Sequence, residues 1–264
     1  MNELIILKLG GSVITKKSEN KLEVNQGNLE RLCRDIAEAK RKTKSRFVIV
    51  HGAGPFGHVL AEEYRLNEGL KGMRSIKGMC ETHASMERLN AIVVDELNKA
   101  GVNAMAFQPS AGGIMEHKKI VYFPIEAVKK MLELDITPVS YGDVLIDIET
   151  GLNILSGDHL VPYLALKLKA SRIVIATDVS GIYDGDPKKN KNAKLVRELT
   201  KDNAARIEIS GSRGVDVTGG MKRKVMELLS VAEMGVSSQV VSGLKPGELR
   251  EALLGNKKLG TIIR

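Results

Sequence analysis

The segment Leu4-Ile5-Ile6-Leu7-Lys8-Leu9-Gly10-Gly11-Ser12 is an almost unbroken apolar run that ends in two glycines. An apolar run without polar alternation is typical of a strand buried on both faces of a parallel sheet. Glycines at the end of such a strand allow backbone N–H groups to approach a ligand closely. In open α/β sheets, ligands bind outside the carboxyl ends of the strands. We therefore expect a parallel-sheet strand with a binding loop at its carboxyl end.

The rest of the chain repeats this alternation of short apolar runs and helical periodicity. It predicts an α/β fold, with a mainly parallel sheet covered on both faces and a hairpin at residues 142–151. The predicted strands are Leu4–Leu9, Phe47–His51, Ala104–Gln108, Thr137–Tyr141, Ile154–Ser156, Arg172–Thr177 and Gln239–Ser242. The predicted helices are Gln26–Lys44, Phe56–Tyr64, Ile76–Ala100, Ile125–Leu134, Asp158–Leu168 and Met221–Met234.

Composition narrows the class of protein. Of the 264 residues, 43% are hydrophobic and 27% charged, and no apolar stretch approaches the ~18–20 residues that span a bilayer. We expect one domain in the cytoplasm, without a signal peptide or membrane insertion. Cys33 and Cys80 would then be buried thiols, and a regulatory disulfide between them is the alternative. The net charge of +8 could indicate nucleic-acid binding, but four Phe, five Tyr and no Trp leave little for base stacking. A lysine-rich surface that attracts anionic substrates is favoured.

Glycine-marked segments recur at four places, each between an apolar run and a predicted helix. They are Lys8–Ser12, His51–His58, Ser156–Asp158 and Asp216–Lys224. The amino end of a helix adds partial positive charge to the N–H groups of such a loop. With lysines and a histidine nearby, the four segments together indicate a site for a chain of phosphates.

Lys8 is the charged residue of an otherwise apolar strand. A lysine there is costly unless its ammonium group emerges at the carboxyl edge of the sheet, where a ligand would bind. The alternative is an ordinary lysine whose stem lies along apolar surface.

Three further residues have a functional and a structural interpretation. His58 would be a donor to a phosphate on the first turn of its helix, or a cap or core residue. Asp158 would position lysines, or cap the helix that it begins. Lys224 lies in a first helical turn, where a cation is unfavourable for the helix dipole and an anionic ligand explains it.

At this point the chain resembles the amino acid kinase superfamily over nearly its whole length, and within it the isopentenyl phosphate kinases of archaeal type. The start Lys8–Thr15 and the late segment Thr177–Tyr183 are common to the superfamily. More specific are Phe56-Gly57-His58, Ser156-Gly157-Asp158 and Asp216-Val217-Thr218-Gly219-Gly220. At Ala53, Pro55 and Ser180 the chain departs from the residues usual in relatives. The first two departures bear on the identity of the acceptor, because Ala53 and Pro55 belong to the loop that would bind it.

The resemblance implies an open αβα sandwich with a mainly parallel central sheet, assembled as a homodimer. Residues 1–168 would form the lobe that binds the phosphoryl acceptor, and residues 169–264 the lobe that binds ATP with Mg²⁺ on its phosphates. The implied catalytic residues are Lys8, Lys17, His58, Asp158 and Lys224. The implied ATP contacts are Lys8, Gly10, Gly11, Ser12, Gly54, Asp178, Tyr183, Gly219, Gly220 and Lys224. Ala53, His58 and Gly157 would hold the phosphate of the acceptor.

The hydrocarbon tail of the acceptor would need an apolar wall. Met79, His83 and Met86 share one face of the predicted helix after Arg74, because they lie at i, i+4 and i+7. Spacing alone favours a plain core stripe. The resemblance instead implies that this face lines the hydrocarbon pocket, with Leu155 opposite.

The resulting hypothesis is ATP-dependent phosphorylation of isopentenyl phosphate to isopentenyl diphosphate. An acceptor that is already a phosphate monoester is ionised at neutral pH and needs no general base, and no all-protein metal cage is expected. One alternative is another small-acceptor kinase of the superfamily, acting on fosfomycin, acetylglutamate, glutamate or uridylate. A nucleotide-binding protein without turnover is the other.

Overall fold

Strand β1 (Leu4–Leu9) lies in the interior of an eight-stranded sheet in the computed structural model. The structure describes residues 3–16, 22–185, 190, 192–204 and 220–264, with the backbone alone for 220–224. The strand order is β10-β12-β11-β9-β1-β2-β6-β3, and each neighbouring pair is parallel except β11 with β12. The other strands are β2 (Arg46–His51), β3 (Ala104–Ala106), β6 (Thr137–Tyr141), β9 (Arg172–Thr177), β10 (Glu198–Leu199), β11 (Ser237–Ser242) and β12 (Thr261–Ile263).

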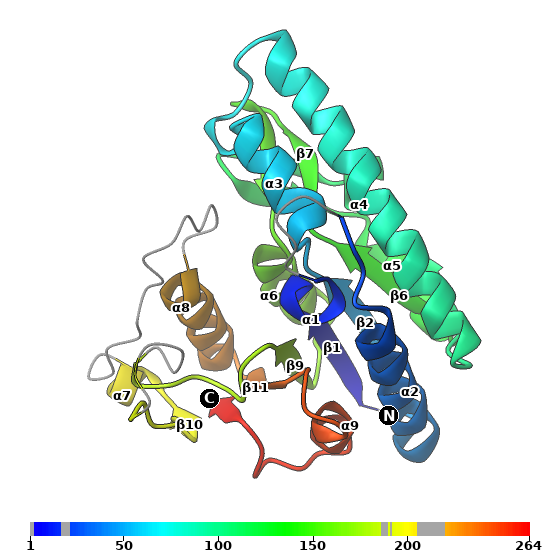
Figure 1. The fold of residues 1–264 in the computed structure, drawn as a ribbon, viewed down its shortest axis with the longest axis vertical. Coiled ribbons are helices and arrows are strands. Elements are labelled where there is room, and N and C mark those ends of the chain that lie inside the picture. Colours follow the sequence, from blue (N-terminus) through cyan, green and yellow to red (C-terminus); the bar gives the residue numbers. More distant parts are fainter. Residues whose placement is uncertain (1–2, 17–21, 186–189, 191, 205–219) are drawn as a thin grey trace.

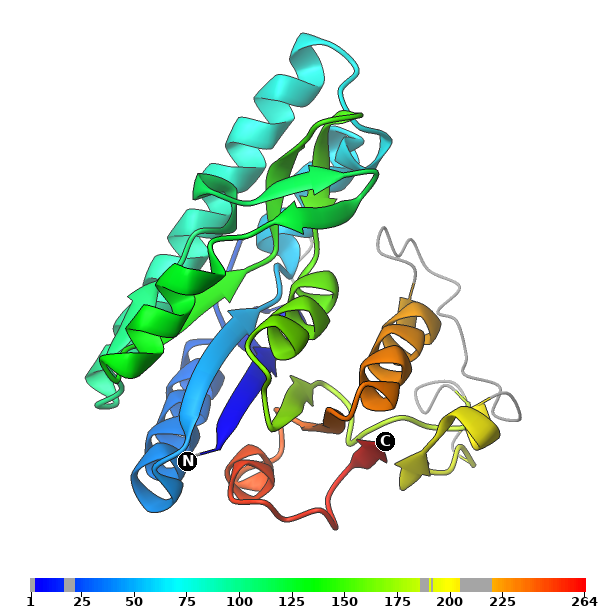
Figure 2. The ribbon, with the colours of Figure 1, turned by 180° about the vertical axis from the view of Figure 1, so that it is seen from behind.

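Helices cover both faces of this sheet, which gives the predicted αβα sandwich (Figures 1 and 2). Ile5, Leu7 and Leu9 of β1 point into one core, and Leu4 and Ile6 point into the other. Such a strand is apolar throughout because both of its faces are buried. Helices of the first core are α1 (Gly11–Ile14), α2 (Gln26–Thr43), α4 (Met73–Lys99) and α9 (Glu248–Leu253). Helices of the second are α5 (Ile125–Glu133), α6 (Gly157–Lys167) and α8 (Gly220–Glu233).

A second, four-stranded sheet lies at one end of the molecule, in the order β5-β4-β7-β8 (Figure 1). Its strands β7 (Asp143–Asp147) and β8 (Gly151–Leu155) form a hairpin that extends beyond the predicted residues 142–151, and β4 (Ile114–Glu116) and β5 (Lys119–Tyr122) extend the sheet. The strand predicted separately at Ile154–Ser156 is the end of β8, antiparallel to β7, and does not belong to the main sheet. A small core of Ala61, Leu66, Val144 and Leu152 joins this sheet to α3 (Pro55–Glu63). The remaining elements are α7 (Lys201–Ala204) and the 3₁₀ turns Leu66–Glu68 and Pro109–Ala111.

The predicted element bounds agree closely with the structure. Strands β1, β6 and β9 have the predicted bounds, and the six predicted helices are present with ends that differ by up to three residues. The elements that were not predicted are α1, β4, β5, β10, β12, α7 and α9. The expectation of two buried thiols is half right, because Cys33 is buried and Cys80 is exposed.

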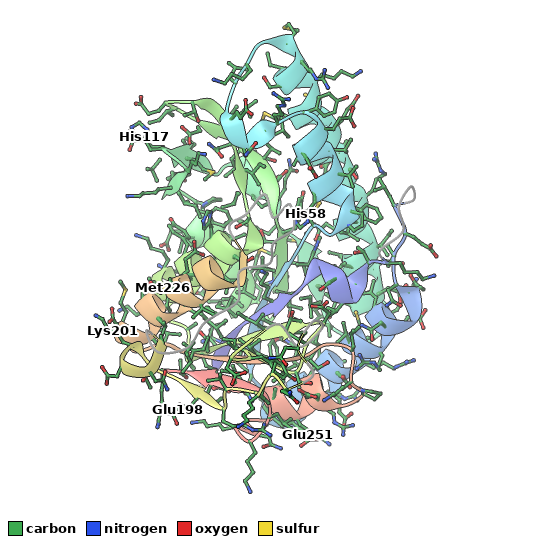
Figure 3. The ribbon with its side chains drawn as sticks, turned by 60° about the vertical axis from the view of Figure 1, so that its left-hand side comes forward. His58, His117, Glu198, Lys201, Met226 and Glu251 are labelled. Carbon is green, nitrogen blue, oxygen red and sulfur yellow. The ribbon has the colours of Figure 1, made fainter. Side chains whose placement is uncertain are left out.

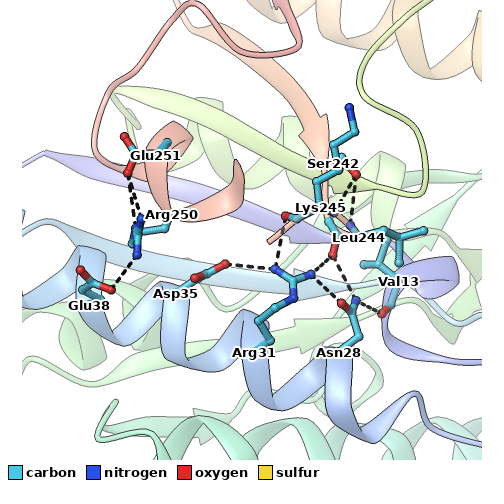
Figure 4. Close-up of polar contacts among 11 residues, drawn as sticks. Val13, Asn28, Arg31, Asp35, Glu38, Ser242, Leu244, Lys245, Arg250 and Glu251 are labelled. Atoms are coloured by element: carbon cyan, nitrogen blue, oxygen red, sulfur yellow. Dashed lines mark hydrogen bonds and ion pairs between the residues drawn. The ribbon is translucent and has the colours of Figure 1, made fainter. Parts of the chain in front are cut away.

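Arg31 of α2 ties together segments that are far apart in sequence (Figure 4). Its guanidinium donates to the carbonyl oxygen of Gly243 at 2.5 Å and to Asn28 Oδ1 at 2.5 Å. Asn28 Nδ2 in turn donates to the carbonyl oxygens of Val13 at 2.6 Å and Gly243 at 3.1 Å. The loop after β11 is therefore held against α1, directly beside the glycine pair that follows β1.

Candidate active site

The glycine loops after β1 and β2 touch each other. Leu9 pairs with His51 in register, so the two parallel strands end side by side and their loops leave the same edge of the sheet. A Cβ added to Gly52 would lie 2.6 Å from the backbone nitrogen of Gly11, and one added to Gly11 would lie 2.8 Å from Gly54 Cα. Both approaches are closer than real Cβ contacts allow. Glycine is therefore required at Gly11 and Gly52 by the contact between the loops.

A cavity of about 760 Å³ opens beside these loops. Its lining residues come from the ends of β1, β2 and β9, from α3 and α4, and from the β6–β7 and β8–α6 turns. They are Lys8, Gly10, Gly11, Ser12, Thr15, Gly52, Ala53, Gly54, Pro55, Gly57, His58, Val59, Ala61, Thr82, Met86, Gly142, Asp143, Val144, Ile154, Leu155, Ser156, Gly157, Asp158 and Thr177.

Lys8 forms an ion pair with Asp158 at the wall of this cavity. Lys8 is 5% exposed, so its ammonium group is removed from bulk water and depends on this partner. The side chain of Ser156, and not that of Asp158, caps α6, because Ser156 Oγ accepts a hydrogen bond from the His159 N–H at 3.3 Å. Of the two interpretations of Asp158, the structure supports the one in which it holds a lysine.

His58 lies on the first turn of α3 and lines the cavity (Figure 3). Gly54 precedes this helix with φ = 53°, a value that favours glycine, and Pro55 occupies its first turn. The side chain of His58 is exposed, so the structure excludes the core interpretation. Ala53 and Gly54 line the cavity beside it, which places a helix amino end and a histidine at one rim.

The other end of the cavity is apolar. Val59 and Ala61 of α3, Met86 of α4, and Val144, Ile154 and Leu155 of the second sheet form its wall. Met86 and Leu155 are 1% and 0% exposed, so their side chains are fixed by packing. The cavity therefore has a polar end at Lys8 and an apolar end between α4 and the second sheet.

Met79 and His83 are absent from the cavity lining that the structure describes, although Met86 is present. Met79 packs against the small core between α3 and the second sheet. His83 Nδ1 lies 3.0 Å from Asp143 Oδ1, and Asp143 itself lines the cavity with its side chain fully buried. Asp143 also accepts hydrogen bonds from the backbone of Val144 at 2.8 Å and Ser110 at 3.3 Å.

His51, the last residue of β2, packs in the core next to the glycine loop that follows it. It is fully buried, its ring stacks on Tyr141 with centroids 5.5 Å apart, and Nε2 lies 3.1 Å from Asn90 Oδ1. Burial lowers the pKa of His51 to about 4, opposed by its hydrogen bonds to Gly52 and Asn90. The imidazole is therefore neutral at physiological pH, and it serves as packing beneath the loop.

The remaining predicted site residues lie elsewhere. Asp178 follows the cavity residue Thr177, whose hydroxyl donates to Asp178 Oδ1 at 3.3 Å, and Tyr183 forms a β-bridge with Leu195. Neither Asp178 nor Tyr183 belongs to the described lining. Gly220 begins α8, so Lys224, the fifth residue of the helix, lies in its second turn, and the expectation of a first-turn lysine was wrong. The side chain of Lys224 is outside the description. Lys17 and Gly219 lie outside the described residues.

Several lining residues were not predicted as site residues. Thr82, Val144 and Ile154 lie inside a helix and strands, with no motif around them to mark them. Strand alternation gives no signal for Ile154, because the predicted residue Leu155 is its direct neighbour and successive strand residues point to opposite faces. Thr177 begins the segment Thr177–Tyr183, and Asp143 ends the segment Pro138–Asp143; both segments carry the family resemblance, which is the signal that could have found these two residues.

A model of the Amino acid kinase family matches residues 3–242. The chain belongs to the amino acid kinase family. It is 38% identical over 267 residues to the isopentenyl phosphate kinase of Methanothermobacter thermautotrophicus, covering 98% of each chain. To the isopentenyl phosphate kinase of Methanocaldococcus jannaschii it is 37% identical, over 96% of this chain and 95% of that one. A crystal structure of an isopentenyl phosphate kinase matches with a TM-score of 0.86 at 34% identity, covering 99% and 100% of the two chains. The family resemblance and the fold inferred from the motifs are confirmed.

The contact between His83 and Asp143 predicts a pH-dependent contribution to stability. The hydrogen bond to Asp143 raises the pKa of His83 above its usual 6.5, burial opposes this, and the charges of Asp143 and Glu87 add to it. A raised pKa means that the contribution is full below pH 6.5 and is lost as pH rises through the folded-state pKa. The stability difference between the parent protein and His83→Gln should therefore shrink as the pH rises above 6.5.

Urea unfolding from pH 5.5 to 8.5 measures this difference. His117→Gln, which replaces an exposed histidine on the turn between β4 and β5, is the control variant. A difference for His83→Gln that stays constant or grows with pH would contradict the assigned contact.

Proposed function

We propose that this amino acid kinase transfers the γ-phosphoryl group of ATP to isopentenyl phosphate, giving isopentenyl diphosphate and ADP. The observation that supports this most directly is the layout of the cavity. The buried Lys8 with its partner Asp158 and the glycine loops stand at one end, and an apolar wall stands at the other. Such a cavity suits an acceptor with a phosphate head and a short hydrocarbon tail.

The polar end would hold the phosphates of ATP through backbone N–H groups. The family resemblance assigns Gly10, Gly11, Ser12 and Gly54 to this role, and all four line the cavity. Lys8 would neutralise the group in transfer, together with Lys224 and Lys17, and Gly219 and Gly220 would lie at the nucleotide end of α8. Asp178 and Tyr183 are assigned to the same nucleotide side, next to Thr177.

The acceptor phosphate would lie between Ala53, His58 and Gly157. All three line the cavity, and a Cβ on Gly157 would lie 3.4 Å from Lys8 Cε, so the acceptor phosphate would be beside Lys8. Met86 and Leu155 would contact the hydrocarbon tail. At about 0.8 kcal/mol per buried CH₂, a five-carbon tail contributes on the order of 4 kcal/mol, more than one hydrogen bond to a charged group. Met79 and His83 would act from behind this wall.

Phosphoryl transfer proceeds through a loose transition state, so the enzyme contributes positioning and charge stabilisation. An ionised acceptor phosphate attacks without a general base, which fits a cavity with lysine, histidine and N–H donors. Asp158 would hold the Lys8 ammonium in place and keep it charged. Mg²⁺ would supply further charge neutralisation on the ATP phosphates. Among the described residues, no cluster of three or more His, Cys, Asp or Glu side chains could hold a metal ion.

The lobes and the assembly belong to the same proposal. Residues 1–168 would bind the acceptor and residues 169–264 would bind ATP, as the family resemblance implies. Within the described chain, Thr177 is the one lining residue after position 168. Two copies would form a homodimer, as the family resemblance implies, and the enzyme would act in the cytoplasm without nucleic acid. No helix in the described part of the chain is both long and apolar enough to cross a membrane.

Other acceptors fit the cavity less well. An amino acid acceptor needs a partner for its ammonium or carboxylate group, yet the apolar end is formed by aliphatic and methionine side chains. Both oxygens of the lining carboxylate Asp143 already accept hydrogen bonds. A phosphonate such as fosfomycin could use His58, but it would leave most of the apolar wall unfilled.

A screen of acceptors by ADP release tests the proposal. With ATP and Mg²⁺, the protein should release ADP fastest with isopentenyl phosphate, and slowly or not at all with fosfomycin, acetylglutamate, glutamate or uridylate. Faster turnover of any of those four would replace the proposed acceptor. Binding of ATP without turnover of any acceptor would identify a nucleotide-binding protein.

His58→Ala should separate the two substrates. Loss of a hydrogen bond to the charged acceptor phosphate is expected to raise the KM for isopentenyl phosphate roughly tenfold to a hundredfold. The KM for ATP should change by less than about twofold, because the ATP phosphates would be held by other groups. His117→Ala is the control, and equal rises in both KM values would contradict the assignment.

A further inference from the structure

A contact between a histidine and a carboxylate joins α6, which begins at the cavity, to α8. His159 Nε2 of α6 lies 2.9 Å from Glu227 Oε1 of α8, and the two side chains are 20% and 25% exposed. Helices α6 and α8 lie next to each other at one face of the main sheet (Figures 1 and 2). The pair is therefore partly shielded from solvent, where a charge-assisted hydrogen bond is stronger than at an open surface.

Both members of this pair are close in sequence to residues assigned to phosphoryl transfer. His159 directly follows Asp158, and its backbone N–H donates to Ser156 Oγ, so the capped first turn of α6 fixes it. Glu227 lies three residues after Lys224, about one helical turn further along the backbone of α8. The contact between His159 and Glu227 thus links the first turn of α6, which carries Asp158, to the middle of α8.

The rest of the described contact between α6 and α8 is apolar. Leu160, Val161 and Leu164 of α6 share a core with Val225 and Leu228 of α8. Apolar packing holds the two helices together, but the hydrophobic effect itself has no preferred direction. A polar contact between a ring nitrogen and a carboxylate oxygen has a preferred geometry, and it can help to fix the register of two helices.

We propose that His159 and Glu227 are positioning residues that set the first turns of α8, and with them Lys224, relative to the Lys8–Asp158 pair. This inference rests on the proposed function, because it assigns the pair to the geometry of phosphoryl transfer. A displacement of about 1 Å in such a site can cost roughly a hundredfold in rate. Disruption of the pair therefore lowers kcat and leaves the KM for the acceptor unchanged.

A double-mutant cycle tests whether Glu227 acts through Lys224. Glu227→Ala should lower kcat at least about tenfold at unchanged KM for isopentenyl phosphate. Glu227→Gln, which keeps an oxygen that accepts from His159, should recover much of this loss. In a Lys224→Ala background, Glu227→Ala should cause no further loss, because no lysine remains to be positioned. Glu233→Gln is the matched control, since Glu233 pairs with Lys201 at the far end of α8.

Losses that multiply in the double variant would overturn the proposal, as would a normal kcat for Glu227→Ala. If Glu227→Ala does not fold, His159→Gln replaces it in the same cycle. A normal kcat for Lys224→Ala would overturn the inference and also the assigned role of Lys224. Failure of the proposed function has a separate signature, namely a parent protein that is inactive on isopentenyl phosphate; the cycle is then run with the acceptor on which the parent is active.

Discussion

The buried ion pair between Lys8 and Asp158 is the constraint on which the site depends. Lys8 stands on an interior strand of the main sheet and is 5% exposed, so its charge is tolerable there only beside an opposite charge. Asp158 lies in the capped first turn of α6, and this turn directly follows the hairpin of β7 and β8.

Close backbone contact around this pair explains the glycines. The loops after β1 and β2 approach so closely that a side chain on Gly11 or Gly52 would collide with backbone of the other loop. Behind them, the Arg31 network holds the loop after β11 against α1, and His51 fills the space below with a neutral ring. A cationic centre and its N–H donors are thereby preorganised before any ligand arrives.

Sequence reasoning located this centre because strand patterns and glycine loops are local signals. Strands β1, β6 and β9 were predicted with their observed bounds, and Lys8, His58 and Asp158 do line one cavity. The second sheet was only half predicted. The turn between β4 and β5 uses His117 and Lys118 at positive φ, where no glycine announces a turn. Periodicity on the long helix α4 could not separate Met86, which lines the cavity, from Met79 and His83, which lie behind its wall.

The central claim is that Lys8 stabilises charge during phosphoryl transfer, and the kcat of Lys8→Met tests it most directly. The variant keeps an apolar stem of similar length, and thermal unfolding establishes that it is folded. Lys16→Met is the control, because Lys16 is half exposed and pairs with Glu23. We predict that kcat with isopentenyl phosphate falls roughly 10²–10³-fold for Lys8→Met and remains near the parent value for Lys16→Met. A folded Lys8→Met variant with near-normal kcat would contradict the claim.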